Sequence, residues 1–358
     1  MIVATVLVPT HDHGATLRLS VGSALAQTVE ALEVFVVGDG MPPAAQAAAE
    51  EVAASDPRVR LFVNPKGPRH GEDHRHRALA EARGRIVCYL ADDDLWLPEH
   101  VETLDRALGE ADFAHALPIR CFPGGDVDAW TVDLSLPHFR DFLLRHHNRV
   151  PLSCGGHTLS LYRKLPQGWS AAPPDLPTDL NMWRKLLSHP DCRAASTMAP
   201  TVIHLASPDR RGWSLEERVR ELEAWRDRTR ELEFRPWLWR RIARSLVGES
   251  GRLEMENLQI REILRHLEAR HRDAADELER LGSACGEARA DAEASRERTA
   301  ALDRELAEER EERRSVHEML ARMSSTATWR LRERLIRVPL LGPLARWAAR
   351  GAAHRAGD

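Results

Sequence analysis

The sequence predicts an α/β fold in which a mostly parallel sheet is flanked by helices and is followed by a long α-helical coiled coil. Short apolar runs alternate with helical segments over the first hundred residues. A heptad repeat then extends over residues 251–325. The composition over 358 residues, 43% hydrophobic and 30% charged, is that of a folded protein with segments of different character.

β-Branched apolar runs mark the strands of the first half, and the stretches between them have helical composition. We expect strands at residues 2–8, 32–37, 59–63 and 85–90, and helices at residues 17–26, 44–54 and 75–82. This alternation implies parallel strands joined by helices, whose carboxyl ends form the edge where ligands bind. Beyond residue 110 the pattern is irregular, with a helix expected at 178–187 and a strand at 199–205.

Changes in composition divide the chain into four parts. We expect a folded domain at residues 1–212, a Trp-rich helical extension at 213–250, a coiled coil at 251–325 and a basic amphipathic tail at 326–358.

The coiled-coil segment has mainly apolar residues at both ends of its seam and small or polar residues in the middle. Such a seam favours a homodimer over a single solvated helix. Asn257 or His271 in the seam would then set the register.

The tail combines Trp329, Trp347 and aliphatic residues with an excess of arginine over acidic residues. This pattern suits peripheral contact with an anionic membrane surface, and it equally suits a short helix that packs on another protein.

Charge and cysteine content exclude several classes of protein. A net charge of −4 argues against nucleic acid as a partner. No stretch has the roughly 18 consecutive apolar residues of a membrane span. The five cysteines form no C-x-x-C pair, which is typical of reduced thiols in the cytoplasm. We therefore expect a cytoplasmic protein, peripheral at the inner face of the plasma membrane if the tail binds lipid.

Three consecutive aspartates, Asp92, Asp93 and Asp94, follow the strand expected at residues 85–90. Core packing does not explain them, because like charges repel and are costly to bury. A divalent cation would relieve the repulsion and would in turn bind phosphate oxygens. The alternative is a helix N-terminus, which needs only one such acid.

A second acid, Asp39, stands between glycines at the end of the strand expected at residues 32–37. On its own this signal is weak, because an aspartate at the end of a strand is common. The chain has neither a P-loop nor a convincing G-x-G-x-x-G, so a dinucleotide fold is not supported.

Together these residues resemble the nucleotide-binding half of the family-2 glycosyltransferases, which have the GT-A fold. Five motifs in residues 1–110 carry the resemblance: VPTHD at 8–12, SALAQT at 23–28, EVFVVGDG at 33–40, RHRALAEARG at 75–84 and ADDDLWLP at 91–98. Their order and spacing match the family. The resemblance implies an inverting, metal-dependent transfer of a sugar from a nucleotide diphosphate, most simply a UDP-sugar, to a hydroxyl acceptor.

The resemblance also implies a role for each matching position. Pro9, Thr10 and Asp12 would line the nucleotide pocket, Asp39 would accept from the base, Arg75 would face the nucleotide or diphosphate, and Asp92 would bind the ribose or the sugar. Asp93, with Asp94 and His204, would hold Mn²⁺ or Mg²⁺. The partners would be a nucleotide-diphospho-sugar donor and a glycan or lipid-linked acceptor, in polysaccharide or glycoconjugate synthesis.

Asp179 matches the general base of the family, which removes the proton of the acceptor hydroxyl as its oxygen attacks the anomeric carbon. An N-cap is the alternative role for Asp179, and Asp175 is the second choice of base. His204 follows a short strand at the position of the family's metal-side histidine, and His157, among glycines, is expected on the acceptor side.

The sequence departs from the family at four places. Residues 38–41 read Gly-Asp-Gly-Met for Asp-Asp-Gly-Ser, and residues 74–76 read His-Arg-His for Ala-Arg-Asn. Ala91 and Thr178 each replace an acid. These changes leave open a non-catalytic coiled-coil scaffold that carries a degenerate transferase domain. A metallohydrolase, suggested by the histidines around residues 11–13 and 70–76, is disfavoured because no H-E-x-x-H is present.

Overall fold

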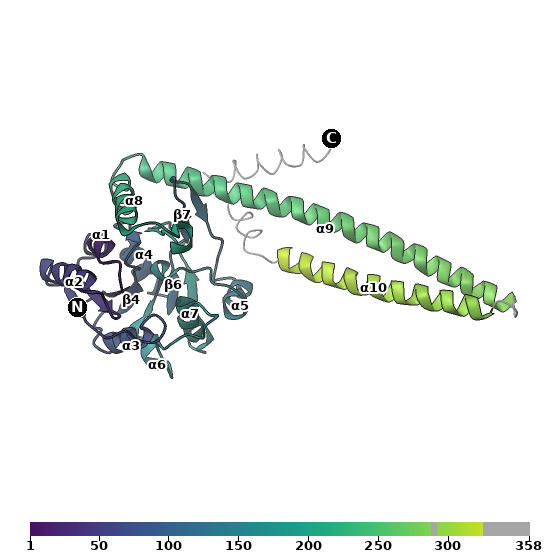
Figure 1. Ribbon diagram of the computed structural model, residues 1–358, viewed down its shortest axis with the longest axis horizontal. Helices are drawn as coiled ribbons and strands as arrows, with labels where there is room; N and C mark the ends of the chain where they lie inside the picture. Colours follow the sequence, from purple (N-terminus) through teal and green to yellow (C-terminus); the bar gives the residue numbers. More distant parts are fainter. Residues whose placement is uncertain (288–291, 325–358) are drawn as a thin grey trace. The chain divides into compact units, whose positions relative to one another are not determined.

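Seven strands pair in the order β10-β6-β9-β4-β1-β2-β3 in the computed structural model, which describes residues 1–287 and 292–324 (Figure 1). The strands are β1 (Ala4–Thr10), β2 (Leu32–Gly38), β3 (Val59–Phe62), β4 (Ile86–Tyr89), β6 (Phe113–His115), β9 (Gly155–Thr158) and β10 (Ala194–Ser196). The chain forms two compact units, Met1–Leu246 and Val247–Asp358, and the whole sheet belongs to the first.

The predicted alternation of strands and helices is confirmed over the first hundred residues. β1 lies parallel between β2 and β4, and β3 lies parallel to β2. The connecting helices are α1 (Gly14–Leu25), α2 (Pro43–Ser55) and α3 (Glu72–Ala80). Every residue of β2 and β4 is buried, as expected for strands covered on both faces. The carboxyl ends of β1, β2 and β4 therefore meet at one edge of the sheet.

The irregular region beyond residue 110 completes this sheet. β9 pairs antiparallel with both β4 and β6, so the sheet is mixed on this side. The helices here are α4 (His100–Ala107), α5 (Pro137–Arg145), α6 (Leu159–Lys164) and α7 (Thr178–Ser188). Two small sheets pair β5 (Leu95–Trp96) with β11 (Val202–Ile203), and β7 (Ile119–Cys121) with β8 (Val127–Ala129). The predicted helix at 178–187 is thus α7, and the strand expected at 199–205 is the shorter β11.

The Trp-rich segment folds as α8 (Leu215–Arg228) and the start of α9 (Phe234–Glu287). Helix α8 begins with a capping box formed by Ser214 and Glu217, and it packs against α1. Trp225 contacts Trp237, with the Arg228 guanidinium 3.6 Å from the centre of the Trp237 ring. These contacts lie within the first unit.

The second unit is a helical hairpin. The continuation of α9 runs antiparallel to α10 (Ala292–Ser324), joined by ion pairs between Arg270 and Glu305 (2.7 Å) and between Arg313 and Glu268 (3.2 Å). The heptad positions predicted to form the seam are buried or half-buried wherever the burial of these two helices is described. The described part of the seam is therefore filled by the chain's own second helix, where the spacing had been taken to indicate a second copy.

The predicted basic tail, 326–358, lies outside the described residues. Within residues 1–287 and 292–324, no helix is both long enough and apolar enough to cross a membrane.

Candidate functional site

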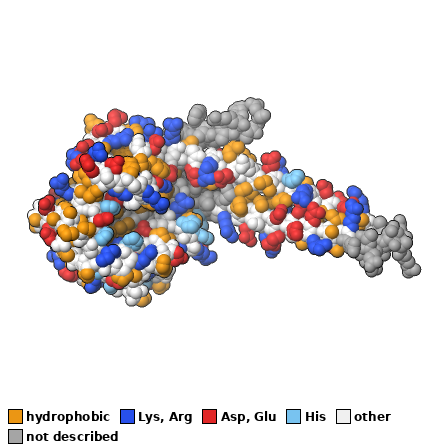
Figure 2. Space-filling model, viewed as in Figure 1, with side chains coloured by type: hydrophobic (Ala, Val, Ile, Leu, Met, Phe, Trp, Pro, Cys, Tyr) orange, Lys and Arg blue, Asp and Glu red, His pale blue; other side chains and the backbone are white. Residues whose placement is uncertain are grey.

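A cavity of about 930 Å³ opens at the carboxyl ends of β1, β2 and β4. On the face shown in Figure 2, histidine side chains gather around a hollow in the first unit. Ten residues that the sequence assigned to the site line this cavity, whereas His157 and Asp175 do not: the ten are Pro9, Thr10, Asp12, Asp39, Arg75, Asp92, Asp93, Asp94, Asp179 and His204. The topology thus brings together side chains that are far apart in the sequence.

Asp39, at the end of β2, is held at one end of the cavity. The Gly67 amide donates to its Oδ1 (2.6 Å), and Lys66 Nζ donates to its Oδ2 (2.5 Å). Burial opposes ionisation, but these two donors prevail and hold the pKa of Asp39 below its usual range. Gly71 packs on this carboxylate with φ of 69°, and an added Cβ would lie 2.6 Å from Asp39 Cγ. Asp39 is therefore a fixed, ionised acceptor.

Arg75, on α3, is buried and incompletely satisfied. Its Nη2 donates to the His70 carbonyl (2.9 Å), while its Nε and Nη1 have no hydrogen-bond partner among the described residues. The guanidinium lies 4.8 Å from the centre of the Trp169 ring. Buried donors without acceptors are costly, so this side chain is suited to an anionic ligand that enters the cavity.

An aromatic network of Trp169, Tyr89 and His157 contacts Arg75 and was not identified from the sequence. Trp169 Nε1 donates to the Tyr89 hydroxyl (3.0 Å), which also hydrogen-bonds His157 Nε2 (2.6 Å). His157 is fully buried in this network, where the glycines around it had suggested the acceptor side of the pocket. Trp169 carried no signal in the sequence because it lies in an irregular stretch without periodicity.

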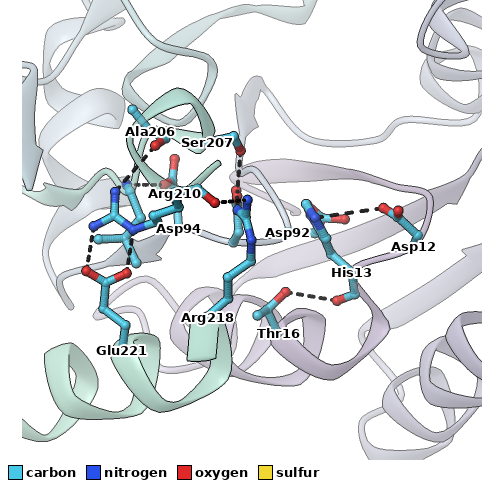
Figure 3. Close-up of polar contacts among 12 residues, drawn as sticks. Asp12, His13, Thr16, Asp92, Asp94, Ala206, Ser207, Arg210, Arg218 and Glu221 are labelled. Carbon is cyan, nitrogen blue, oxygen red and sulfur yellow. Dashed lines mark hydrogen bonds and ion pairs between the residues drawn. The ribbon is translucent and has the colours of Figure 1, made fainter. Parts of the chain in front are cut away.

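Each carboxylate of the aspartate triplet faces a different basic side chain. His13 Nδ1 lies 3.3 Å from Asp92 Oδ1, and this hydrogen bond raises the pKa of His13 to about 9 (Figure 3). His204 Nδ1 lies 3.0 Å from Asp94 Oδ2. Arg218 Nη1, from α8, lies 3.8 Å from Asp93 Oδ2. His13 and Arg218 were not singled out from the sequence.

Asp94 is the most completely bonded of the three. Besides His204, it accepts from Ser153 Oγ (2.5 Å) and from the Leu205 amide (2.8 Å). Burial alone would raise its pKa, but His204 and these donors hold that pKa below its usual range. Asp94 thereby fixes the ring of His204.

Asp93, like Asp92, has a single side-chain hydrogen bond among the residues that the structure describes. Ser207 Oγ donates to its Oδ2 at 3.2 Å. Burial, followed by the charges of Asp94 and Asp92, raises the pKa of Asp93 to about 7.

The hydrogen bonds of Asp93, Asp94 and His204 show which of their atoms remain free to bind a divalent cation. Within the described part of the chain, no group of three or more His, Cys, Asp and Glu side chains is arranged to hold a metal by itself. Asp93 has carboxylate capacity to spare, and His204 is bonded to Asp94 through Nδ1 alone, which leaves Nε2 for a metal. Asp94 has both oxygens engaged. The donor set therefore fits a cation held by Asp93 and His204 and completed by the oxygens of a bound diphosphate.

Asp179, at the start of α7, faces the cavity from the other side of the triplet's loop. Asn148 Nδ2 donates to its Oδ2 (2.7 Å), and the Leu180 amide donates to its Oδ1 (2.8 Å). Burial raises the pKa of Asp179 above its usual range despite these donors. A partly buried carboxylate with a raised pKa has the properties of a general base. The N-cap role considered for Asp179 is not found, because α7 has Pro177 at its N-cap position without a side-chain cap hydrogen bond and Asp179 lies inside the first turn.

Comparison with known proteins gives one family match. The model of the family "Glycosyl transferase family 2" matches residues 5–166, which confirms the resemblance drawn from the motifs. The GalNAc(5)-diNAcBac-PP-undecaprenol beta-1,3-glucosyltransferase of Campylobacter jejuni is 26% identical over 31% of this chain and 36% of its own length. The chain thus spans less than half the length of the curated relatives it matches.

Two solved structures are also similar. A mannosyltransferase from Pyrobaculum calidifontis, in complex with GDP-Man and Mn²⁺, is 18% identical over 59% of this chain and 58% of its own, with a TM-score of 0.42. TarS 1–349 of S. aureus, in complex with UDP-GlcNAc, is 16% identical over 60% of this chain and 61% of its own, with a TM-score of 0.45.

Proposed function

We propose, from the premise that residues 5–166 carry a glycosyltransferase family 2 domain, that this chain is an inverting glycosyltransferase. It would transfer a sugar from a nucleotide diphosphate, most simply UDP, to a hydroxyl group of the acceptor. The observation that carries the proposal is that one cavity holds a buried guanidinium with two unbonded nitrogens (Arg75), a carboxylate with spare capacity (Asp93) and a carboxylate of raised pKa (Asp179).

Each of the residues that line the cavity would have its own role in the proposed reaction. Asp39 would accept from the nucleotide base, with Pro9, Thr10 and Asp12 along the same wall, and Arg75 would donate to the diphosphate. Asp92, fixed by His13, would accept from the ribose or the sugar.

A Mn²⁺ or Mg²⁺ ion held by Asp93 and His204 would stabilise the charge that develops on the departing diphosphate. Asp94 supports this site by orienting His204 through Nδ1.

Asp179 would remove the proton of the acceptor hydroxyl. Burial raises the pKa of Asp179, and an ionised carboxylate of raised pKa takes up a proton more readily than an ordinary carboxylate does. The opposite face of the sugar must remain open to the acceptor for inversion to occur. Water is excluded only when donor and acceptor fill the cavity.

We also propose which acceptor the enzyme uses, where in the cell it acts and how the chain dimerises. The name of the C. jejuni relative gives it a glycan on a polyprenyl diphosphate carrier, and a lipid-linked glycan in polysaccharide or glycoconjugate synthesis is the acceptor that we propose here. A cytoplasmic enzyme held at the inner face of the plasma membrane by residues 326–358 would reach it. Homodimerisation would use the hairpin, where Leu258, Ile263 and Met319 remain exposed.

A donor screen tests the transferase activity. UDP-, GDP- and dTDP-sugars are incubated with the full chain, Mn²⁺ and a lipid-linked glycan acceptor, and release of the nucleoside diphosphate is measured for the wild type and for Asp93→Asn. We expect release from one donor class and its loss in the variant. Release from none of the donors, with intact folding, would favour the non-catalytic scaffold instead.

A further inference from the structure

Asp93 and Arg218 form an incomplete pair in the first unit. Their side chains are 13% and 15% exposed, so neither charge is fully solvated. Arg218 Nη1 is buried and has no hydrogen-bond partner, although it lies 3.8 Å from Asp93 Oδ2. A buried donor and a buried carboxylate thus face each other just beyond hydrogen-bond distance.

Helix α8 fixes the position of this guanidinium. Arg218 Nη2 donates to the carbonyl of Arg210 (3.0 Å), and Arg210 is itself paired with Glu221, one turn further along α8. Arg210 also donates to the Cys121 carbonyl (3.0 Å). Figure 3 shows Arg218 extending from α8 toward the segment that carries Ser207. Arg210, whose carbonyl accepts from Arg218, is therefore itself held by Glu221 and by the Cys121 carbonyl, so the position of Arg218 is fixed.

Arg218 contacts the Asp93 carboxylate from the side that does not line the cavity. Arg218 is absent from the lining of the cavity, whereas Asp93 and Ser207 belong to it. A ligand in the cavity therefore meets Asp93 and does not meet Arg218. The effect of Arg218 on a ligand must pass through the carboxylate, which makes it a positioning residue.

We propose that Arg218 is the resident counter-ion of Asp93, which balances this carboxylate when no divalent cation is bound. The inference rests on the proposed function, because it takes Asp93 as the residue that receives the cation. It assigns a role at the site to α8, a helix beyond residues 5–166 that match the family.

The charges determine the sign of the effect. His13 faces Asp92 and His204 faces Asp94, so Arg218 is the only Lys, Arg or His within 4 Å of the Asp93 carboxylate among the described residues, and its removal leaves no such side chain there. A divalent cation is then attracted more strongly, since a repelling positive charge near its ligand is gone. We expect the Kd for Mn²⁺ to fall by about tenfold when this charge is removed in a partly buried site.

The experiment measures the binding of Mn²⁺ to the full chain by calorimetry, first alone and then with UDP present, because diphosphate oxygens would complete the cation site. Arg218→Met removes the charge and the hydrogen bonds, Arg218→Gln removes the charge and retains a donor, and Arg218→Lys retains the charge. We expect tighter Mn²⁺ binding in the first two variants and a Kd within about twofold of wild type in the third. Arg220→Met, an exposed position on the same helix, is the matched control and should not change the Kd.

Asp93→Asn separates this inference from the proposed function. If Asp93→Asn loses Mn²⁺ binding while Arg218→Gln, folded by circular dichroism, binds as wild type does or more weakly, the inference about Arg218 is wrong and the metal site stands. If Asp93→Asn binds Mn²⁺ as wild type does, the metal site itself is misplaced. Failure of the wild type and of all variants to bind Mn²⁺, alone or with UDP, GDP or dTDP, would overturn both.

Discussion

Substitution of Asp179 with asparagine keeps the shape of the side chain and removes the carboxylate that would take the acceptor's proton. A general base contributes on the order of 10²- to 10⁴-fold to a rate, or roughly 3–5 kcal/mol of barrier. We therefore expect turnover to fall by at least about a hundredfold. The KM for the donor should change little, because Asp39 and Arg75, which we propose to hold the nucleotide, are unchanged in this variant.

The structural cost of the same substitution follows from its hydrogen bonds. Asn148 Oδ1 already accepts from the Val150 amide (2.9 Å), so Asn148 keeps its orientation and its Nδ2 would face the new amide nitrogen. One lost hydrogen bond costs about 1–3 kcal/mol, partly offset by relief of a buried charge. The Tm should fall by only a few degrees.

The pH dependence distinguishes a base from a structural acid. Because the folded-state pKa of Asp179 is raised, its ionisation lowers the stability of the wild type as pH rises through that pKa. The turnover should rise with pH over the same range, since the ionised form is the base. Asp179→Asn should lose both dependences.

Initial transfer rates and thermal unfolding are measured across pH for the wild type, Asp179→Asn and the exposed control Asp175→Asn. Turnover of Asp179→Asn within about fivefold of wild type, with the acid limb of the profile retained, would refute the assignment of the base.

Three further substitutions test other contacts. His13→Gln removes a group whose pKa is raised to about 9 by Asp92, so the stability advantage of the wild type, about 2 kcal/mol, should be complete below pH 6.5 and lost as pH rises through 9, as urea unfolding would show. Trp169→Leu removes the ring beneath Arg75 and should raise the donor KM roughly tenfold with kcat nearly unchanged, in steady-state assays. Glu309→Leu replaces a buried carboxylate that accepts no hydrogen bond and is ion-paired with Arg270 (3.2 Å); because Arg270 is exposed and stays paired with Glu305, the Tm of the hairpin should rise by a few degrees in calorimetry.

The first half of the fold could be predicted because its strands are encoded locally. The apolar run of β2 is long, β-branched and buried throughout, so its sequence alone indicates a central parallel strand. By contrast, β9 reads Gly-Gly-His-Thr. A Cβ at Gly155 would lie 2.7 Å from the ring of Trp183, so this strand depends on the close packing of Trp183 against its glycine. The sequence of β9 itself does not indicate this contact.

The residues of the site likewise fall into those that the sequence could identify and those that only the structure shows. Asp39 and Arg75 belong to motifs of fixed spacing and could be assigned in advance, and both line the cavity. Trp169 and Arg218 reach the site from irregular or distant segments, and only the tertiary structure shows their contacts.

The heptad repeat predicted which faces of the C-terminal helices are covered. It could not predict the covering partner, because the spacing is the same for a second copy and for the chain's own returning helix. The ion pairs of Arg270 with Glu305 and of Arg313 with Glu268 identify the partner within the hairpin. Homodimerisation remains a prediction for the outer face of this hairpin.

The central claim is that the cavity binds a nucleoside diphosphate together with a divalent cation. Calorimetric titration of the full chain with UDP, GDP and dTDP, each with and without Mn²⁺, tests it most directly. We predict that one nucleotide, most simply UDP, binds in the presence of Mn²⁺ and much more weakly without it. Binding of none of the three under either condition, by a folded protein, would contradict the account.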